Sequence, residues 1–104
     1  MERARFYRNA FGTRLRTLRR EMDLSMREVA TGLGVTITYV SHLEAGRTRP
    51  SHDMALRVAR LFDADEEEVA VLAGYLPGDI EEILVENPKR ALATLRASGG
   101  GNAG

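Results

Sequence analysis

The chain has no cysteine and no tryptophan, and its aromatic residues are three phenylalanines and three tyrosines among 104 residues. The lack of cysteine excludes disulfides and thiolate metal sites and suits a reducing compartment. No segment has the run of about 18 apolar residues that a membrane-spanning helix needs, and the basic segment 1–12 lacks the apolar core of a signal peptide. We therefore expect a soluble, cytoplasmic protein with one compact helical core, which a chain of this length can form.

The chain is also poor in the residues that build catalytic sites. Its two histidines, His42 and His52, are not joined by a serine and an acid that the predicted helices would gather into a pocket. The acidic segment 63–68 alternates carboxylates as an EF-hand loop does, but the sixth position is Glu68 instead of glycine and the twelfth is Gly74 instead of a carboxylate. We expect neither an enzyme nor a bound metal or cofactor.

The net charge is zero, but the charge is unevenly distributed along the chain. Residues 1–50 contain ten arginines and five acidic residues, whereas residues 51–104 contain five basic and ten acidic residues. The first half therefore carries a net charge of +5 and the second half −5. This asymmetry favours a protein that faces a polyanion on one side, and charge alone is equally typical of ordinary solvated helices.

Residues 24–50, LSMREVATGLGVTITYVSHLEAGRTRP, predict two short helices joined by a tight turn. Ser25 and Glu28 have the spacing of a capping box, which starts a helix over 26–33. Gly34 ends this helix, because glycine adopts the left-handed conformation at a helix C-terminus without steric cost. A pair of helices joined in this way is the geometry that places a helix in a DNA groove.

The second helix of the pair spans 36–45, with Thr36 as N-cap and Gly46 after its last residue. At about 100° per residue, Val40 and Leu43 point toward the core. The opposite face carries small or polar side chains, namely Thr38, Ser41, His42 and Ala45. Short donors and acceptors suit a helix that lies against base edges, whereas a solvent-facing helix usually carries Glu, Lys and Arg.

The segment from about 11 to 73 resembles the lambda-repressor and Cro type of helix-turn-helix regulator, the XRE family. The resemblance rests on an ordered set of motifs: LRTLRREMDLS, EVATGLGV, ITYVSHLEAGRTRPS and ALRVARLFDAD. It implies an all-α fold, in which a compact five-helix DNA-binding domain of the lambda-repressor type is followed here by two short C-terminal helices. It also implies a transcriptional regulator that binds double-stranded DNA in a sequence-specific manner.

The resemblance also assigns roles to individual side chains. The positions expected at or near bases are Thr36, Ile37, Thr38, Ser41 and His42. Two arginines of the first helix, Arg14 and Arg20, lie off its inward stripe and are expected to reach phosphate. The full set of expected phosphate contacts is Arg14, Arg20, Arg27, Tyr39, Arg47 and Arg49. Arg19 and Glu44 match an arginine and a glutamate that often form a structural ion pair in this family, and that pair would hold the recognition helix on the scaffold.

Two positions depart from the pattern of the family. Met26 stands where a glutamine often opens the first motif helix and contacts phosphate. Ile37 stands where a polar residue usually begins the recognition helix. Its side chain either packs on a thymine methyl group or folds back onto the core.

The remaining periodicity predicts three more helices within a DNA-binding domain of residues 1–74. Their ranges are 3–22, 52–62 and 66–73, beside the motif helices 26–33 and 36–45. The first of them would bury Ala10 or Phe11, Leu15, Leu18 and Met22. Ser51 opens the 52–62 helix, and Asp65 with Glu68 forms a capping pattern at the start of the 66–73 helix.

Residues 75–97 extend beyond what such a domain needs. Asp79 is expected to cap a short helix, which Asn87-Pro88 separates from a last one. Because two short amphipathic helices cannot bury their apolar faces alone, they must pack on the core, on a second copy of the chain or on another protein. The residues expected at a dimer or partner interface are Ile80, Ile83, Leu84, Leu92 and Leu95. The tail 98–104, SGGGNAG, is expected to be disordered.

These features predict a homodimeric regulator, a repressor, that places its 36–45 helix in the major groove at each half of a palindromic operator. The protein would be cytoplasmic, encoded by a bacterium or a phage, and associated with the nucleoid when bound. The alternative is an antitoxin or co-regulator whose C-terminal helices bind a partner protein, with or without DNA binding. The expected partners are therefore double-stranded DNA, a second copy and a regulatory protein, and no membrane.

Overall fold

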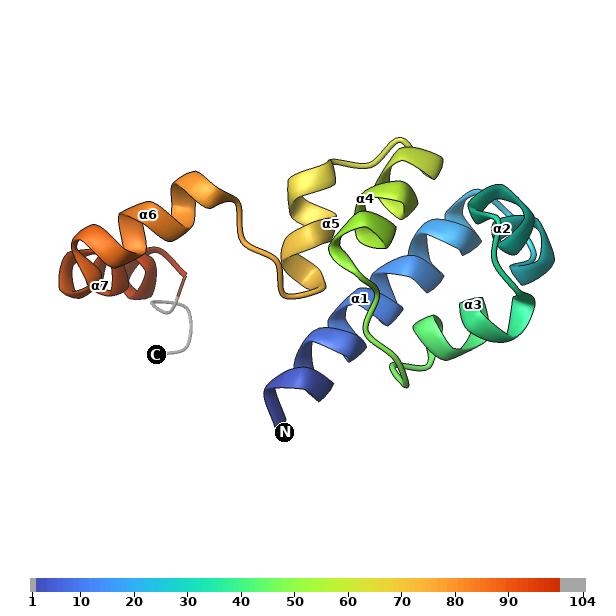
Figure 1. Cartoon of the computed structure of the whole chain (residues 1–104), viewed down its shortest axis with the longest axis horizontal. Helices are drawn as coiled ribbons and strands as arrows, with labels where there is room; N and C mark the ends of the chain where they lie inside the picture. Colours follow the sequence, from blue (N-terminus) through green and yellow to red (C-terminus); the bar gives the residue numbers. More distant parts are fainter. Residues whose placement is uncertain (1, 100–104) are drawn as a thin grey trace.

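The computed structural model describes residues 2–99, and every regular element in this range is a helix (Figure 1). The helices are α1 (Glu2–Glu21), α2 (Met26–Leu33), α3 (Ile37–Glu44), α4 (His52–Leu61), α5 (Glu66–Leu72), α6 (Gly78–Glu86) and α7 (Pro88–Ser98). The all-α class predicted from the sequence is confirmed, and the bounds of the first five helices differ from the predicted ones by at most one residue at each end. None of the helices in the described range is long and apolar enough to cross a membrane.

The turn between α2 and α3 forms through the local signals that the sequence carries. At the start of α2, the Ser25 hydroxyl accepts a hydrogen bond from the Glu28 amide at 3.0 Å, and the Glu28 carboxylate accepts one from the Ser25 amide at 2.8 Å. Gly34 ends α2 in the left-handed conformation, with φ of 72°. Thr36 caps α3 by accepting a hydrogen bond from the Tyr39 amide at 3.0 Å. The two helices are thus joined by three residues.

The next two helices begin at the predicted side-chain caps. The Ser51 hydroxyl accepts a hydrogen bond from the Met54 amide at 3.0 Å at the start of α4. The Asp65 carboxylate accepts one from the Glu68 amide at 3.0 Å at the start of α5. Both caps satisfy amide donors that have no partner within the helix, so the helix starts are fixed by single side chains.

The prediction that Asp79 caps α6 is wrong. The helix begins one residue earlier, at Gly78, and its N-cap is Pro77, which makes no side-chain cap hydrogen bond. Asp79 lies within the first turn, where its charge interacts favourably with the helix dipole. Asn87 caps α7 as expected of a helix break, because its side-chain oxygen accepts a hydrogen bond from the Arg90 amide at 3.2 Å.

The hydrophobic core lies among α1 to α5, which form one bundle in Figure 1. Its largest fully buried apolar side chains are Phe11, Leu15, Val29, Leu33, Val40, Leu43, Val58 and Val69. The inward stripe predicted for α1 is correct at Phe11, Leu15 and Leu18 but wrong at Met22, which is 53% exposed. The cause is that α1 ends at Glu21, so Met22 belongs to the turn that follows and no longer to the helix face.

The last two helices stand apart from this bundle, as Figure 1 shows at its left side. α6 and α7 pack chiefly on each other, and neither has a buried residue along its described length. In this structure they therefore do not complete the core of the single chain. The predicted disordered tail begins too early at Ser98, which is the last residue of α7, and residues 100–104 of that tail lie outside the described range.

Candidate nucleic-acid interface

An ion pair fixes α3 against α1. The Glu44 side chain is completely buried (0% exposed), and its Oε2 accepts a hydrogen bond from Nε of Arg19 at 2.6 Å. Nη2 of Arg19 donates a second bond to Oε1 at 3.0 Å, and Nε of Arg16 approaches the same oxygen at 3.4 Å. The hydrogen bond with Glu44 raises the pKa of the Arg19 guanidinium above its ordinary value, so the arginine stays ionised. The structure thus brings together the two residues that the family resemblance paired.

α1 and α3 also approach each other closely at a glycine that the sequence reasoning did not single out. A Cβ atom on Gly12 would lie 2.8 Å from the Glu44 carbonyl oxygen and nearer still to that of Leu43. Any larger residue at this position would push the end of α3 away from α1. A glycine inside a helical pattern is a signal for such a packing contact, and Gly12 interrupts the predicted 3–22 helix in this way.

The outer face of α3 carries no arginine, lysine or carboxylate side chain. Val40 and Leu43 are fully buried, while Thr38 and Ser41 are exposed and His42 is half-buried. Ile37 is 38% exposed and is not part of the core, which favours the readout alternative for its side chain. The face therefore presents two hydroxyls, one imidazole and one apolar side chain to a ligand.

Two predicted contact residues, one at the N-cap of α3 and one within the helix, also have a structural role. The Thr36 side-chain oxygen accepts the capping hydrogen bond at the helix start, which leaves its O–H able to donate to a ligand. Tyr39 is half-buried against the core, and burial raises the pKa of its hydroxyl, with the nearby Tyr75 adding to the shift. The Tyr39 hydroxyl is therefore protonated near neutral pH and remains a hydrogen-bond donor.

Three of the predicted phosphate contacts, Arg20, Arg27 and Arg47, are exposed. Arg27 lies in the first turn of α2, and Arg47 lies in the loop that follows α3. None of the three forms an ion pair with another described residue. Their charge is thus not neutralised by the protein, in contrast to Arg19, and is free to act on a polyanion.

Arg49 makes contacts within the chain that were not predicted from the sequence. Its Nε donates a hydrogen bond to the Ala73 carbonyl at 2.7 Å and its Nη2 donates one to the Gly74 carbonyl at 3.1 Å. The guanidinium also lies over the ring of Tyr75, 4.1 Å from the ring centre, and the Tyr75 hydroxyl donates to the Pro50 carbonyl at 2.8 Å. These contacts hold the side chain against the end of α5 and give Arg49 a structural role, while the residue stays exposed and its predicted phosphate contact stays a prediction.

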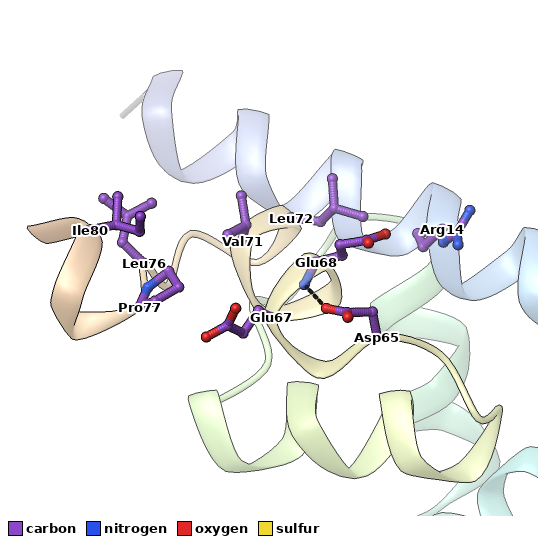
Figure 2. Close-up of a pocket in the computed structure, with 9 residues that line it drawn as sticks. All are labelled: Arg14, Asp65, Glu67, Glu68, Val71, Leu72, Leu76, Pro77 and Ile80. Carbon is purple, nitrogen blue, oxygen red and sulfur yellow. Dashed lines mark hydrogen bonds between the residues drawn. The ribbon is translucent and has the colours of Figure 1, made fainter. Parts of the chain in front are cut away.

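Arg14 also differs from the prediction. It follows Gly12 by two residues, so its side chain leaves α1 about 200° around the helix from the contact with α3. Figure 2 shows Arg14 with Leu72 and Glu68 at a groove on the α5 side of the molecule. The structure therefore separates Arg14 from the surface that α3 presents.

The arrangement of α2 and α3 defines a helix-turn-helix protein, and comparison with known proteins agrees with it. A helix-turn-helix domain family matches residues 10–72. The chain is 29% identical over 97 residues to an uncharacterized HTH-type transcriptional regulator found in two strains of Mycobacterium tuberculosis, a match that covers 84% of this chain and 69% of the relative. It is 30% identical over 59 residues to an uncharacterized HTH-type transcriptional regulator of Archaeoglobus fulgidus, covering 57% of this chain and 83% of the relative.

A solved structure leads to the same conclusion. The clp gene regulator ClgR from C. glutamicum superimposes with a TM-score of 0.58 at 31% identity, over 64% of this chain and 87% of that one. The chain belongs to the helix-turn-helix family of transcriptional regulators, which bind DNA. The resemblance read from the sequence motifs is thereby confirmed.

Proposed function

We propose that the protein regulates transcription as a homodimer that inserts α3 of each copy into the major groove at one half of a palindromic operator. Occupation of a promoter in this way blocks its use, so the expected effect is repression. The observation that carries the proposal is the outer face of α3, which is uncharged and held rigidly by the buried pair of Glu44 with Arg19. A surface of this kind matches base edges in shape and hydrogen-bonding capacity.

Base recognition is assigned to Thr38, Ser41 and His42, with Ile37 placed to contact a thymine methyl group. Ser41 is the sharpest test, because replacing a small exposed hydroxyl leaves the fold intact. We expect Ser41→Ala to lose about 1–3 kcal/mol of discrimination at one base position and to keep its preference elsewhere. Selection of bound sites from random duplex DNA, carried out with both proteins, measures this. An unchanged preference at every position would remove Ser41 from the recognition set.

Phosphate contacts are assigned to Arg27 and Arg47, supported by Arg20 and the Tyr39 hydroxyl. We expect Arg47→Ala to weaken binding to all duplex sequences alike and to reduce the slope of log K against log salt by about 1. Arg14→Ala is the matched control, with both variants measured on a half-operator so that dimerisation plays no part. Arg14 leaves α1 on the side away from α3, so this variant should keep the slope of the unmodified protein. Equal slopes for both variants would contradict the assignment of Arg47.

Dimerisation is assigned to the apolar face of the α6–α7 pair. A groove of about 250 Å³ opens between these helices, lined in part by Ile80, Ile83, Leu84 and Leu95. Three of these side chains are exposed in the single chain, and burying them against a second copy removes apolar surface from water. Two-fold pairing then sets two α3 helices against successive major grooves, about 34–36 Å apart.

We expect Ile83→Asp to convert the dimer to a monomer and to weaken binding to a complete operator far more than to a half-operator. The matched control is Val85→Asp: Val85 is 80% exposed, belongs to the same helix and does not line the groove. Sedimentation equilibrium gives the oligomeric state of both variants. If the protein without substitutions is already monomeric, the exposed α6–α7 pair instead suits the alternative role of holding a different regulatory protein.

A further inference from the structure

A second groove lies between α5 and the start of α6, with Arg14 of α1 at its edge (Figure 2). Its volume is about 640 Å³. The floor is apolar and consists of Val71, Leu72, Leu76, Pro77 and Ile80. The rim carries three carboxylates and one arginine, namely Asp65, Glu67, Glu68 and Arg14. We refer to it as the acidic groove.

The carboxylates at the rim are not neutralised within the chain. Glu67 and Glu68 are exposed and form no ion pair with a described residue, whereas their neighbour Glu66 is paired with Arg60 at 3.2 Å. Asp65 is committed to the cap of α5. On the floor, Val71 and Leu76 remain exposed in the single chain. The acidic groove therefore suits a segment that is both apolar and basic.

α7 has that chemistry. All three of its charged residues, Lys89, Arg90 and Arg96, are basic, and none forms an ion pair with another described residue. Lys89 and Arg96 lie three residues before and four residues after Leu92, so the three side chains share one face of the helix. Leu92 is exposed. One helix face thus presents an apolar side chain between two cations.

The α7 of the same chain does not occupy the acidic groove. It packs on α6 and lies at the far end of the molecule from the α1–α5 bundle in Figure 1. Ile80 lines both the acidic groove and the groove between α6 and α7. The acidic groove is therefore continuous with the surface proposed for dimerisation.

We infer that the acidic groove is the binding site, here called the seat, for α7 of a second copy of the chain. Leu92 would lie on its apolar floor, with Lys89 and Arg96 beside Glu67 and Glu68. This inference rests on the homodimer proposed above and adds its geometry. In a two-fold dimer each copy supplies one groove and one helix, so the contact occurs twice and the assembly closes. Opposite charges at a rim select the partner and fix its register more than they add affinity.

The test exchanges the charges in two separate chains. The groove variant carries Glu67→Lys and Glu68→Lys, and the helix variant carries Lys89→Glu and Arg96→Glu. Each variant alone brings like charges together at both seats, and we expect its dimer dissociation constant to rise by about tenfold or more at low salt. In an equimolar mixture both seats of a mixed dimer join opposite charges, and we expect affinity close to that of the unmodified protein. A chain with all four substitutions should pair with itself again.

Sedimentation equilibrium measures these affinities, and thermal unfolding checks that each variant is folded. Variants that dimerise like the unmodified protein, or weakened variants that do not recover on mixing, would overturn the acidic groove as the seat and leave the homodimer in place. An unmodified protein that stays monomeric at every concentration would overturn the homodimer and this inference together. Affinity for a half-operator should be the same in all the chains, which separates either failure from a failure of DNA binding.

Discussion

Replacement of Glu44 by alanine is expected to lower the free energy of unfolding by about 3–5 kcal/mol. The Glu44 carboxylate is fully buried and accepts hydrogen bonds from two arginines, so its removal leaves the guanidinium of Arg19 largely buried beside an empty site. An unpaired buried charge costs far more than a lost surface contact. Chemical denaturation followed by circular dichroism measures the change.

Glu66→Ala is the matched control for this prediction. Glu66 also pairs with an arginine, at 3.2 Å, but both side chains are about half exposed to solvent. Its removal should change the free energy of unfolding by less than about 1 kcal/mol. The folded fraction of Glu44→Ala should keep the base preference of the unmodified protein, because Glu44 touches no part of the proposed DNA surface. Similar losses of stability for both variants would show that burial of the pair is not what stabilises α3.

Gly12→Ala should destabilise the protein by up to about 3 kcal/mol, although alanine is intrinsically favoured over glycine inside a helix by about 1 kcal/mol. The added Cβ would lie 2.8 Å from the Glu44 carbonyl oxygen and nearer still to that of Leu43, and these backbone atoms cannot rotate away as a side chain can. The strain is relieved by shifting the end of α3, so DNA affinity should fall as well. Unfolding midpoints in denaturant and affinity for duplex DNA are the measurements.

Gly32→Ala provides the comparison at a second helical glycine. A Cβ on Gly32 would meet a methyl group of Leu61 at 2.9 Å, and that flexible side chain can rotate away. The gain in helix propensity then outweighs the contact, and the variant should be as stable as the unmodified protein or slightly more so. A stabilising effect of Gly12→Ala would mean that α1 and α3 do not touch as closely as described.

Short-range structure was predictable because its signals lie within a few residues of one another. The capping pair of Ser25 with Glu28, the left-handed Gly34 and the cap at Thr36 are each decided inside one turn. These signals predict α2, α3 and the outward face of α3. The pairing of Arg19 with Glu44 came from the family resemblance, since no local pattern joins residues 25 positions apart.

The contacts of long side chains could not be predicted, because an arginine reaches partners that the sequence does not reveal. The phosphate contact of Arg49 stays a prediction, whereas its hydrogen bonds to carbonyl groups about 25 residues further along the chain were not predicted. Arg14 was assigned from its place off the core stripe, which does not distinguish the side of α1 near α3 from the side near α5. The roles of Thr38, Ser41 and His42 at bases stay predictions until a binding experiment tests them.

The hydrogen bonds of Arg49 and Tyr75 connect the loop after α3 to the start of the C-terminal extension. In the proposed dimer this contact lies between the helix that reads bases and the helices that hold the second copy. The spacing between the two half-operators is then set by folded protein and not by a flexible linker. We therefore expect the proposed dimer to bind weakly to operators whose halves are one base pair too close or too far apart, even when every base in each half is correct.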